Sequence, residues 1–299
     1  ITFKNILMEV DMRTIIQNLG ELDKNIFYMK REDLIPISFG GNKARKASKF
    51  FEEIDAGTYD SVVTYGSSSS NHCRVVANMA VARDMKCYII GPEESSEETF
   101  NSKLMELFGA EITVVPVNKV HDTIESKLDE LKRSGLKPYF IPGGGHGILG
   151  TQAFVECYEE IREYEQQNDI RFDYIFLASG TGATQAGLIC GKLINKDTKE
   201  VVGISIARKN PRGREVVIDS VKEYFENRNE NVINEEIEDA TIFCDTYIGD
   251  GYGSANENVD EVVGDIMRNY GIPMDCTYTG KAFWGMREYI KEHAIEDKN

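Results

Sequence analysis

Four short loops of this 299-residue chain carry residue types that could do chemistry. The first loop, residues 38–46, reads SFGGNKARK, and its two glycines allow a tight turn that places Lys43 at the start of the following helix. The positive end of a helix dipole disfavours an ammonium group, so we expect a lowered pKa for Lys43. Such an amine could form a Schiff base with a carbonyl compound, although the spacing alone also fits an ordinary solvated lysine.

The second loop, residues 66–72, reads GSSSSNH and lies between a predicted strand and a predicted helix. Hydroxyl and backbone N–H groups beside a helix N-terminus suit an anion such as a carboxylate. Helix capping alone would account for Ser70 or Asn71 but not for the whole run. The candidate carboxylate ligands are Ser67, Ser68, Ser69, Ser70, Asn71 and His72.

The third loop, residues 179–187, reads SGTGATQAG and directly follows the apolar run at 174–178. Its small residues expose backbone N–H groups, and the next helix begins at once, so the loop is suited to phosphate. It lacks the GK[ST] ending of a nucleotide loop, and we therefore expect a single phosphate group rather than a triphosphate. The candidate phosphate ligands are Ser179, Gly180, Thr181, Gly182, Ala183 and Thr184.

The fourth loop, residues 143–150, contains a formal GxGxxG between Gly145 and Gly150, the spacing of dinucleotide-binding loops. The acidic residue expected about 20 residues later would be Asp169 or Asp173, and neither clearly ends a second strand. A dinucleotide-dependent oxidoreductase is therefore an alternative from another class. A non-catalytic amino-acid-binding protein is a further alternative, but it would not need Lys43.

Short apolar runs of strand type alternate along the chain with amphipathic stretches of helical period. The predicted strands are residues 26–29, 61–65, 87–90, 112–116, 138–142, 174–178 and 201–207. The clearest predicted helices are residues 44–54, 71–84, 99–108, 123–133 and 149–164. This alternation predicts an α/β fold with mainly parallel, twisted sheets and helices on both faces. Ligands in such folds lie at the carboxyl ends of strands.

The composition excludes several partners. Thirty-four basic and fifty acidic residues give a net charge of −16, which repels nucleic-acid backbones and anionic membranes. The six cysteines and four histidines are dispersed without metal-site spacing, so we expect no metal and mostly buried, reduced thiols. No apolar run approaches 18 residues and the first residues lack a secretion signal, which predicts a cytoplasmic protein.

Taken in order, GGNKARK at 40–46, SNHCR at 70–74, SGTGATQAGL at 179–188 and YTGKA at 278–282 resemble a known family. It is the 1-aminocyclopropane-1-carboxylate deaminase and D-cysteine desulfhydrase family of fold type II pyridoxal-phosphate enzymes, which are similar to tryptophan synthase β. The resemblance begins at KREDL, residues 30–34, and covers almost the whole chain.

The resemblance implies a pyridoxal 5′-phosphate cofactor in a cleft between two domains, and a homodimer. The expected large domain comprises residues 1–50 and 156–299, and the expected small domain comprises residues 51–155. Lys43 would bind the cofactor aldehyde, Asn71 would lie beside the ring hydroxyl, and residues 179–184 would hold the phosphate.

The same resemblance makes Ser70, Tyr252 and Tyr278 active-site residues. Two positions near the expected substrate depart from the family pattern. Ser69 replaces a glutamine that usually precedes SNH, and His146 lies in a loop that usually reads GGS-N. Both positions therefore bear on substrate identity.

Position 279 bears on the reaction. The cyclopropane deaminases of the family look to carry a glutamate there, which keeps the cofactor's pyridine nitrogen protonated, whereas this chain has Thr279. A neutral hydroxyl stabilises a carbanion at Cα less, and this favours prompt loss of a group from Cβ. We expect β-elimination from a small amino acid such as D-cysteine, with Lys43 as base. Cyclopropane ring opening, racemisation and other lyase reactions are the alternatives within the class.

Overall fold

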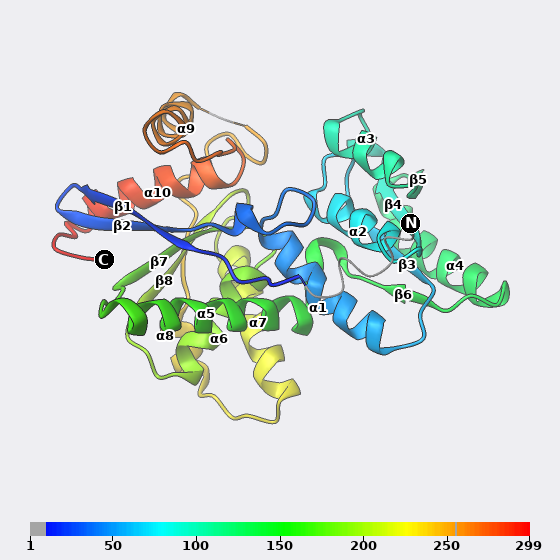
Figure 1. The fold of residues 1–299 in the computed structure, drawn as a ribbon, viewed down its shortest axis with the longest axis horizontal. Coiled ribbons are helices and arrows are strands. Elements are labelled where there is room, and N and C mark those ends of the chain that lie inside the picture. Colours follow the sequence, from blue (N-terminus) through cyan, green and yellow to red (C-terminus); the bar gives the residue numbers. More distant parts are fainter. Residues whose placement is uncertain (1–9, 255) are drawn as a thin grey trace. The chain divides into compact units, whose positions relative to one another are not determined.

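The computed structural model describes residues 10–254 and 256–299, which form two compact units (Figure 1). The first unit comprises Glu32–Gly150 with the described residues up to Thr14, and the second comprises Ile15–Arg31 and Thr151–Asn299. Residues 32–50 thus group with 51–150, unlike in the division expected from the sequence. The reason is α1 (Asn42–Ala56), whose Ala47 and Phe51 share one core with Val62 and Val76.

The first unit contains a four-stranded parallel sheet in the order β5-β4-β3-β6. Its strands are β3 (Ser61–Tyr65), β4 (Lys86–Pro92), β5 (Glu111–Val115) and β6 (Pro138–Phe140). Its helices are α1, α2 (Asn71–Val81), α3 (Phe100–Leu107) and α4 (Val120–Arg133), with short 3-10 turns η1 (Glu32–Leu34), η2 (Glu93–Ser95), η3 (Val117–Lys119) and η4 (Gly143–Gly145). Val62 packs with α1 and α2, while its neighbour Val63 packs with Leu131 of α4. Because side chains alternate along a strand, helices cover both faces of this sheet.

The second unit contains a three-stranded parallel sheet in the order β7-β8-β9 and an antiparallel hairpin. The strands are β7 (Tyr174–Ser179), β8 (Glu200–Ser205), β9 (Ile242–Cys244), and β1 (Ile16–Leu22) with β2 (Asn25–Lys30). The helices are α5 (Ile148–Asn168, from its fourth residue), α6 (Ala183–Ile194), α7 (Arg212–Asn227), α8 (Asn234–Ala240), α9 (Glu257–Tyr270) and α10 (Thr279–Glu292). Gln185 of α6 packs over Gly203, and Gly285 of α10 packs on Ile204. Adjacent strand residues face opposite sides, so α6 and α10 cover opposite faces.

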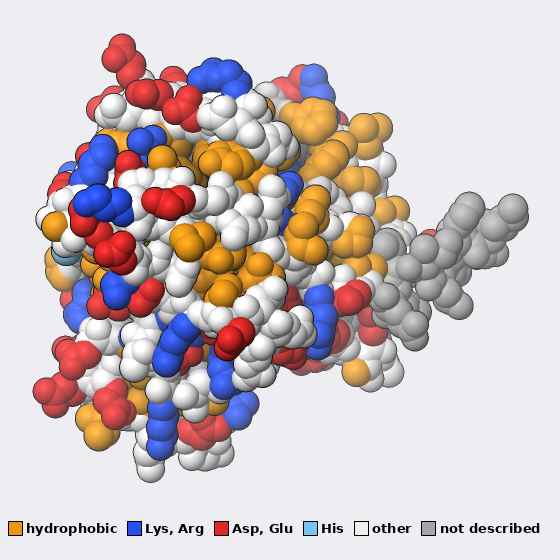
Figure 2. Space-filling view, turned by 60° about the vertical axis from the view of Figure 1, so that its left-hand side comes forward, with side chains coloured by type: hydrophobic (Ala, Val, Ile, Leu, Met, Phe, Trp, Pro, Cys, Tyr) orange, Lys and Arg blue, Asp and Glu red, His pale blue; other side chains and the backbone are white. Residues whose placement is uncertain are grey.

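The expected α/β class with parallel sheets between helices is confirmed. Each of the seven predicted strands and five predicted helices overlaps an observed element, with ends that differ by a few residues. All six cysteines are free thiols, and four of them are buried. On the face shown in Figure 2, Lys and Arg side chains are mixed with Asp and Glu side chains. None of the helices in the described ranges is both long and apolar enough to cross a membrane.

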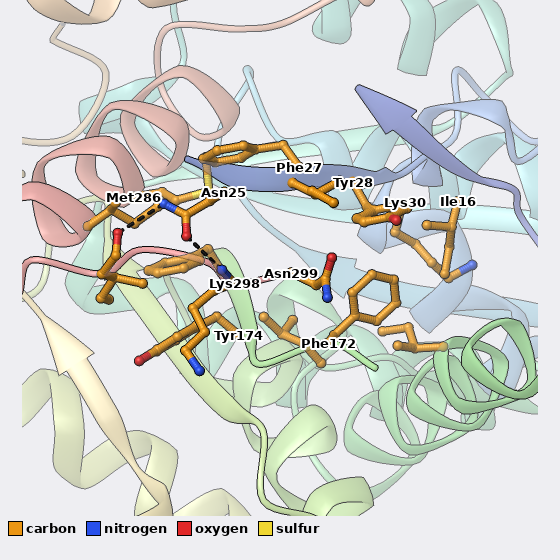
Figure 3. A pocket seen from close by; sticks show the side chains of 16 residues that line it. Ile16, Asn25, Phe27, Tyr28, Lys30, Phe172, Tyr174, Met286, Lys298 and Asn299 are labelled. Carbon is orange, nitrogen blue, oxygen red and sulfur yellow. Dashed lines mark hydrogen bonds between the residues drawn. The ribbon is translucent and has the colours of Figure 1, made fainter. Parts of the chain in front are cut away.

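A cavity of about 160 Å³ lies in the second unit beside β2, β7 and α10 (Figure 3). Residues 298 and 299, which line this cavity, link β2 to the segment that precedes β7 through backbone hydrogen bonds. Ile26 N donates to Lys298 O at 2.9 Å, and Asp173 N donates to Asn299 O at 2.8 Å. The lining contains none of the residues that the sequence marks as chemical, so the candidate site lies elsewhere.

Candidate active site

Lys43 is the second residue of α1, directly after the turn that the two glycines form. Its Nζ donates a hydrogen bond to the carbonyl oxygen of Gly144 at 3.0 Å. Burial lowers the pKa of Lys43 to about 8, so part of the amine is unprotonated near neutral pH. Burial is therefore the leading cause of the shift, whereas the sequence suggested the helix dipole. The result is a nucleophilic amine.

The turn before Lys43 has an unusual backbone. Four successive residues, 38–41, have positive φ values between 44° and 85°. Gly40 is required there, because a Cβ atom would lie 2.6 Å from the carbonyl oxygen of Asp33. Gly41 N also donates to Glu32 O at 2.7 Å, which fixes the start of α1 and with it the direction of Lys43.

The serine turn, residues 66–71, links β3 to α2. Ser70 is the N-cap of α2, and its Oγ accepts from Cys73 N at 3.2 Å. The hydroxyl oxygens of Ser67 and Ser69 lie 3.2 Å apart, and the carbonyl of Ser68 accepts from Thr99 Oγ1 at 2.7 Å. Capping uses the Ser70 oxygen as an acceptor, and a side-chain hydrogen bond also links Ser70 to Cys73.

His72 is buried, with 1% of its surface exposed. Its Nε2 lies 3.0 Å from the Oγ1 of Thr64, whose proton is donated to Ile141 O at 2.8 Å. Nε2 therefore carries the histidine proton, and Nδ1 has no hydrogen-bond partner among the residues that the structure describes. Burial and the nearby charge of Lys43 lower the pKa of His72 well below its usual range, so the ring is neutral.

The glycine-rich fourth loop packs against α1. The carbonyl oxygen of Gly145 occupies the place where Gly150 would carry a Cβ atom. A Cβ atom on Gly145 would lie 3.1 Å from Cβ of Lys46, which is buried. Tight packing at Gly145 and Gly150, together with the positive φ of Gly147, thus accounts for the GxGxxG spacing. Half-buried His146 follows the turn. The loop also supplies the carbonyl group of Gly144 that holds Lys43.

The third loop, in the second unit, joins β7 to α6. Gly182 is the N-cap of α6, with φ of 97°, and it has no side chain that could cap the helix, so the positive end of α6 favours an anion here. Ser179 is buried, and its Oγ has no hydrogen-bond partner within the described ranges. An orphaned buried hydroxyl beside a helix N-terminus fits a phosphate group. Residues 179–184 therefore suit the phosphate end of a cofactor.

Tyr252 and Tyr278, also in the second unit, are brought together, with their hydroxyl oxygens 2.6 Å apart. Burial, and then the hydrogen bond with Tyr252, raise the pKa of Tyr278. Asp275 caps α10 and so positions Tyr278, because Asp275 Oδ1 accepts from Tyr278 N at 2.6 Å. The hydroxyl of Thr279 donates to Asp275 Oδ2 at 2.9 Å.

Four residues that the sequence did not single out hold the candidate residues in place. They are Arg74, Asn101, Asp275 and Lys281. Lys281 is buried, and its Nζ donates to Ile248 O at 2.8 Å and Gly251 O at 2.5 Å, which fixes the segment before Tyr252. Arg74 and Lys281 lie within the quoted motifs, and Asp275 could be recognised as a helix cap. Asn101 carries no local signal because it comes from a different helix.

A buried amine of lowered pKa and a phosphate-type turn are each features of enzymes that bind a phosphorylated aldehyde cofactor. The family model described as "Pyridoxal-phosphate dependent enzyme" matches residues 12–299, and the chain belongs to this family. Its cofactor is pyridoxal phosphate, and the resemblance read from the sequence is confirmed. The dinucleotide alternative is wrong.

Individual relatives cover nearly the whole chain. A 1-aminocyclopropane-1-carboxylate deaminase of Burkholderia multivorans is 32% identical over 95% of this chain and 88% of its own length. A D-cysteine desulfhydrase of Serratia proteamaculans is 29% identical over 96% of this chain and 89% of its own length. A crystal structure of an ACC deaminase homologue superposes with a TM-score of 0.86 at 29% identity, covering 97% of this chain and 88% of that chain.

Proposed function

We propose that this enzyme catalyses β-elimination on a small amino acid such as D-cysteine, with release of a 2-oxo acid, ammonia and the group at Cβ. Relatives named D-cysteine desulfhydrase and relatives named 1-aminocyclopropane-1-carboxylate deaminase are similarly close, so overall identity does not choose between the two activities. Thr279 is the residue on which we base the choice between these two activities. It is neutral where the cyclopropane deaminases resembled by the sequence carry a glutamate. The neighbouring carboxylate of Asp275 is already occupied by capping α10.

In the first unit, we assign Lys43 as the cofactor-binding amine and as the base that removes the substrate's α-proton. Its pKa of about 8 supports both roles, because the unprotonated amine is populated near neutral pH. Pyridoxal phosphate, when bound, supplies an electron sink for the charge that develops at Cα. We assign binding of the substrate carboxylate to the serine turn, because its hydroxyl groups lie where α2 begins.

In the second unit, we assign the phosphate group to Ser179 and the N-terminus of α6. Tyr278 is assigned as the acid that protonates the departing thiolate. The raised pKa of Tyr278 keeps its hydroxyl group protonated near neutral pH, so this proton is available to the sulfur atom as the bond between Cβ and sulfur breaks. Tyr252 orients the Tyr278 hydroxyl through their hydrogen bond.

A substrate panel tests the proposal. The holoenzyme is given D-cysteine, L-cysteine and 1-aminocyclopropane-1-carboxylate, and the 2-oxo acid, ammonia and sulfide are measured. We expect equal amounts of pyruvate and sulfide from D-cysteine, and a much lower kcat/KM for the cyclopropane. A higher kcat/KM for ring opening than for sulfide release would contradict the proposal and favour the deaminase activity.

We also infer that the enzyme works as a homodimer in the cytoplasm. The family resemblance supports the dimer, and six free thiols support a reducing compartment. Sedimentation equilibrium of the holoenzyme tests the dimer, and a mass equal to one chain across the micromolar range would contradict it.

A further inference from the structure

The side-chain amide of Asn71 has a fixed orientation. Its Oδ1 accepts hydrogen bonds from Arg74 Nη1 at 2.8 Å and from Asn101 Nδ2 at 3.0 Å. A guanidinium group only donates, so the oxygen of the Asn71 amide, and not its nitrogen, must face Arg74. The Nδ2 of Asn71 therefore points away from Arg74, and it has no hydrogen-bond partner in the described part of the chain.

Asn101, in the first turn of α3, is oriented by the same arginine. Its Oδ1 accepts from Arg74 Nη1 at 2.8 Å, which leaves its Nδ2 to donate to Asn71 Oδ1 and to Ser69 O at 2.7 Å. The Nη1 atom of Arg74 thus fixes the orientation of both amides. Arg74 and Asn101 both donate to Asn71 Oδ1, so both contacts favour the same orientation of the Asn71 amide.

Arg74 is itself firmly held. Only 9% of its surface is exposed, its Nε donates to Ser38 Oγ at 3.2 Å, and its Nη2 donates to Ser38 O at 3.0 Å. The guanidinium group also lies over the ring of Phe39, 5.3 Å from its centroid. No carboxylate within residues 10–254 and 256–299 forms an ion pair with Arg74. A buried cation without a counter-ion favours a negative charge nearby.

We propose that Arg74 and Asn101 are positioning residues that present Asn71 Nδ2 as a hydrogen-bond donor to the anionic oxygen of the cofactor ring. The inference rests on the proposed function, in which Asn71 lies beside the ring hydroxyl. Arg74 also joins Asn71 to Ser38, which lies in the turn that leads into Lys43. The amide and the amine are thereby held by one hydrogen-bond network.

The variant Asn101→Asp tests the orientation directly. It keeps the acceptor for Arg74 but replaces the donor to Asn71 Oδ1 with a carboxylate oxygen, so the Asn71 amide loses its fixed orientation and its Nδ2 is no longer held toward the ligand. The readout is the pH at which the visible absorbance band of the bound cofactor changes. Loss of a donor to a charged oxygen should raise this pH by about one unit or more. Asn101→Ala removes the amide, both its donor to Asn71 and its acceptor for Arg74, but adds no opposing carboxylate, and it should give a smaller rise.

A double variant separates positioning from general damage. If Asn101 acts through Asn71, then Asn101→Asp should cause no further rise in a protein that already carries Asn71→Ala. Arg83→Ala is the matched control, because Arg83 lies just beyond the same helix and pairs with Asp55 at 2.8 Å. It should lower the melting temperature without moving the band.

The outcomes distinguish this inference from the proposed function. A wild-type protein that acquires no visible band with pyridoxal phosphate overturns both. A coloured wild type whose band titrates at the same pH after Asn101→Asp and Asn101→Ala overturns the inference alone. A rise that persists in the Asn71→Ala background also overturns it, because Asn101 would then act without Asn71.

Discussion

The hydroxyl oxygens of Tyr252 and Tyr278 lie 2.6 Å apart, a distance at which one phenol must donate to the other. Tyr252 is 57% exposed, whereas Tyr278 is half-buried and has a raised pKa. The pair therefore combines one phenol in contact with solvent and one whose proton is retained at high pH. In the mechanism that we propose, a proton lost from Tyr278 is replaced through Tyr252.

This relationship predicts the behaviour of Tyr278→Phe. Without its acid, elimination of a thiolate should slow about 100-fold or more in kcat, with a small change in KM. Elimination of chloride from β-chloro-D-alanine needs no leaving-group proton and should slow far less. Steady-state assays with both substrates measure the difference. Equal losses for the two leaving groups would show that Tyr278 has no role as an acid.

The lowered pKa of Lys43 predicts how the apoenzyme takes up its cofactor. Only the unprotonated amine attacks an aldehyde, so the rate of uptake should rise with pH through a midpoint of about 8. An ordinary lysine would place this midpoint near 10.5. Stopped-flow absorbance measures the rate, Lys43→Ala should abolish covalent uptake and turnover, and Lys49→Ala is the control on the same helix. A midpoint above 10 would refute the assignment.

The orphaned hydroxyl of Ser179 predicts opposite effects on stability and on binding. In Ser179→Ala, a buried polar group without a partner is removed, so the apoenzyme should keep its stability or gain up to about 1 kcal/mol. Loss of a hydrogen bond to phosphate should weaken cofactor affinity about ten-fold or more. Urea unfolding of the apoenzyme and cofactor titration measure the two effects. Unchanged affinity would place the phosphate elsewhere.

Asn25 predicts the stability of the second unit. It is buried, its Nδ2 donates to Ile295 O at 3.0 Å, and its Oδ1 accepts from Lys298 N at 3.0 Å (Figure 3). Asn25→Ala leaves both backbone groups without this partner and should lower the free energy of unfolding by about 3 kcal/mol. Lys24→Ala, which removes an exposed ion pair with Glu296, is the control and should change little. Urea unfolding curves compare the two, and equal curves would contradict the role of Asn25.

The elements that carry the site could be predicted from the sequence because their signals are local. The strand at β7, for example, is an apolar run that ends where small residues begin, and both the strand end at Ser179 and the helix start at Ala183 follow from this change. The same logic located the serine turn and the turn before Lys43. Each needs only residues within one short segment.

Interactions between distant segments could not be predicted in this way. The pKa of Lys43 depends on burial in the first unit and not on its own helix alone, and Asn101 reaches Asn71 from another helix. The contact between the β1–β2 hairpin and residues 295–299 could not be predicted either, because no residue pattern in one segment indicates the other as its partner. These contacts depend on the tertiary fold.

The two-part make-up of the second unit also sets an order of events during synthesis. In its β1–β2 hairpin the backbone partner of Ile26 is Lys298, so the hairpin must wait until residue 298 has been synthesised. The first unit is nearly continuous in sequence and can fold while translation proceeds. Closure of so long a loop is slow, and a nascent chain therefore exposes the apolar side of its hairpin until late, when chaperone binding would matter most.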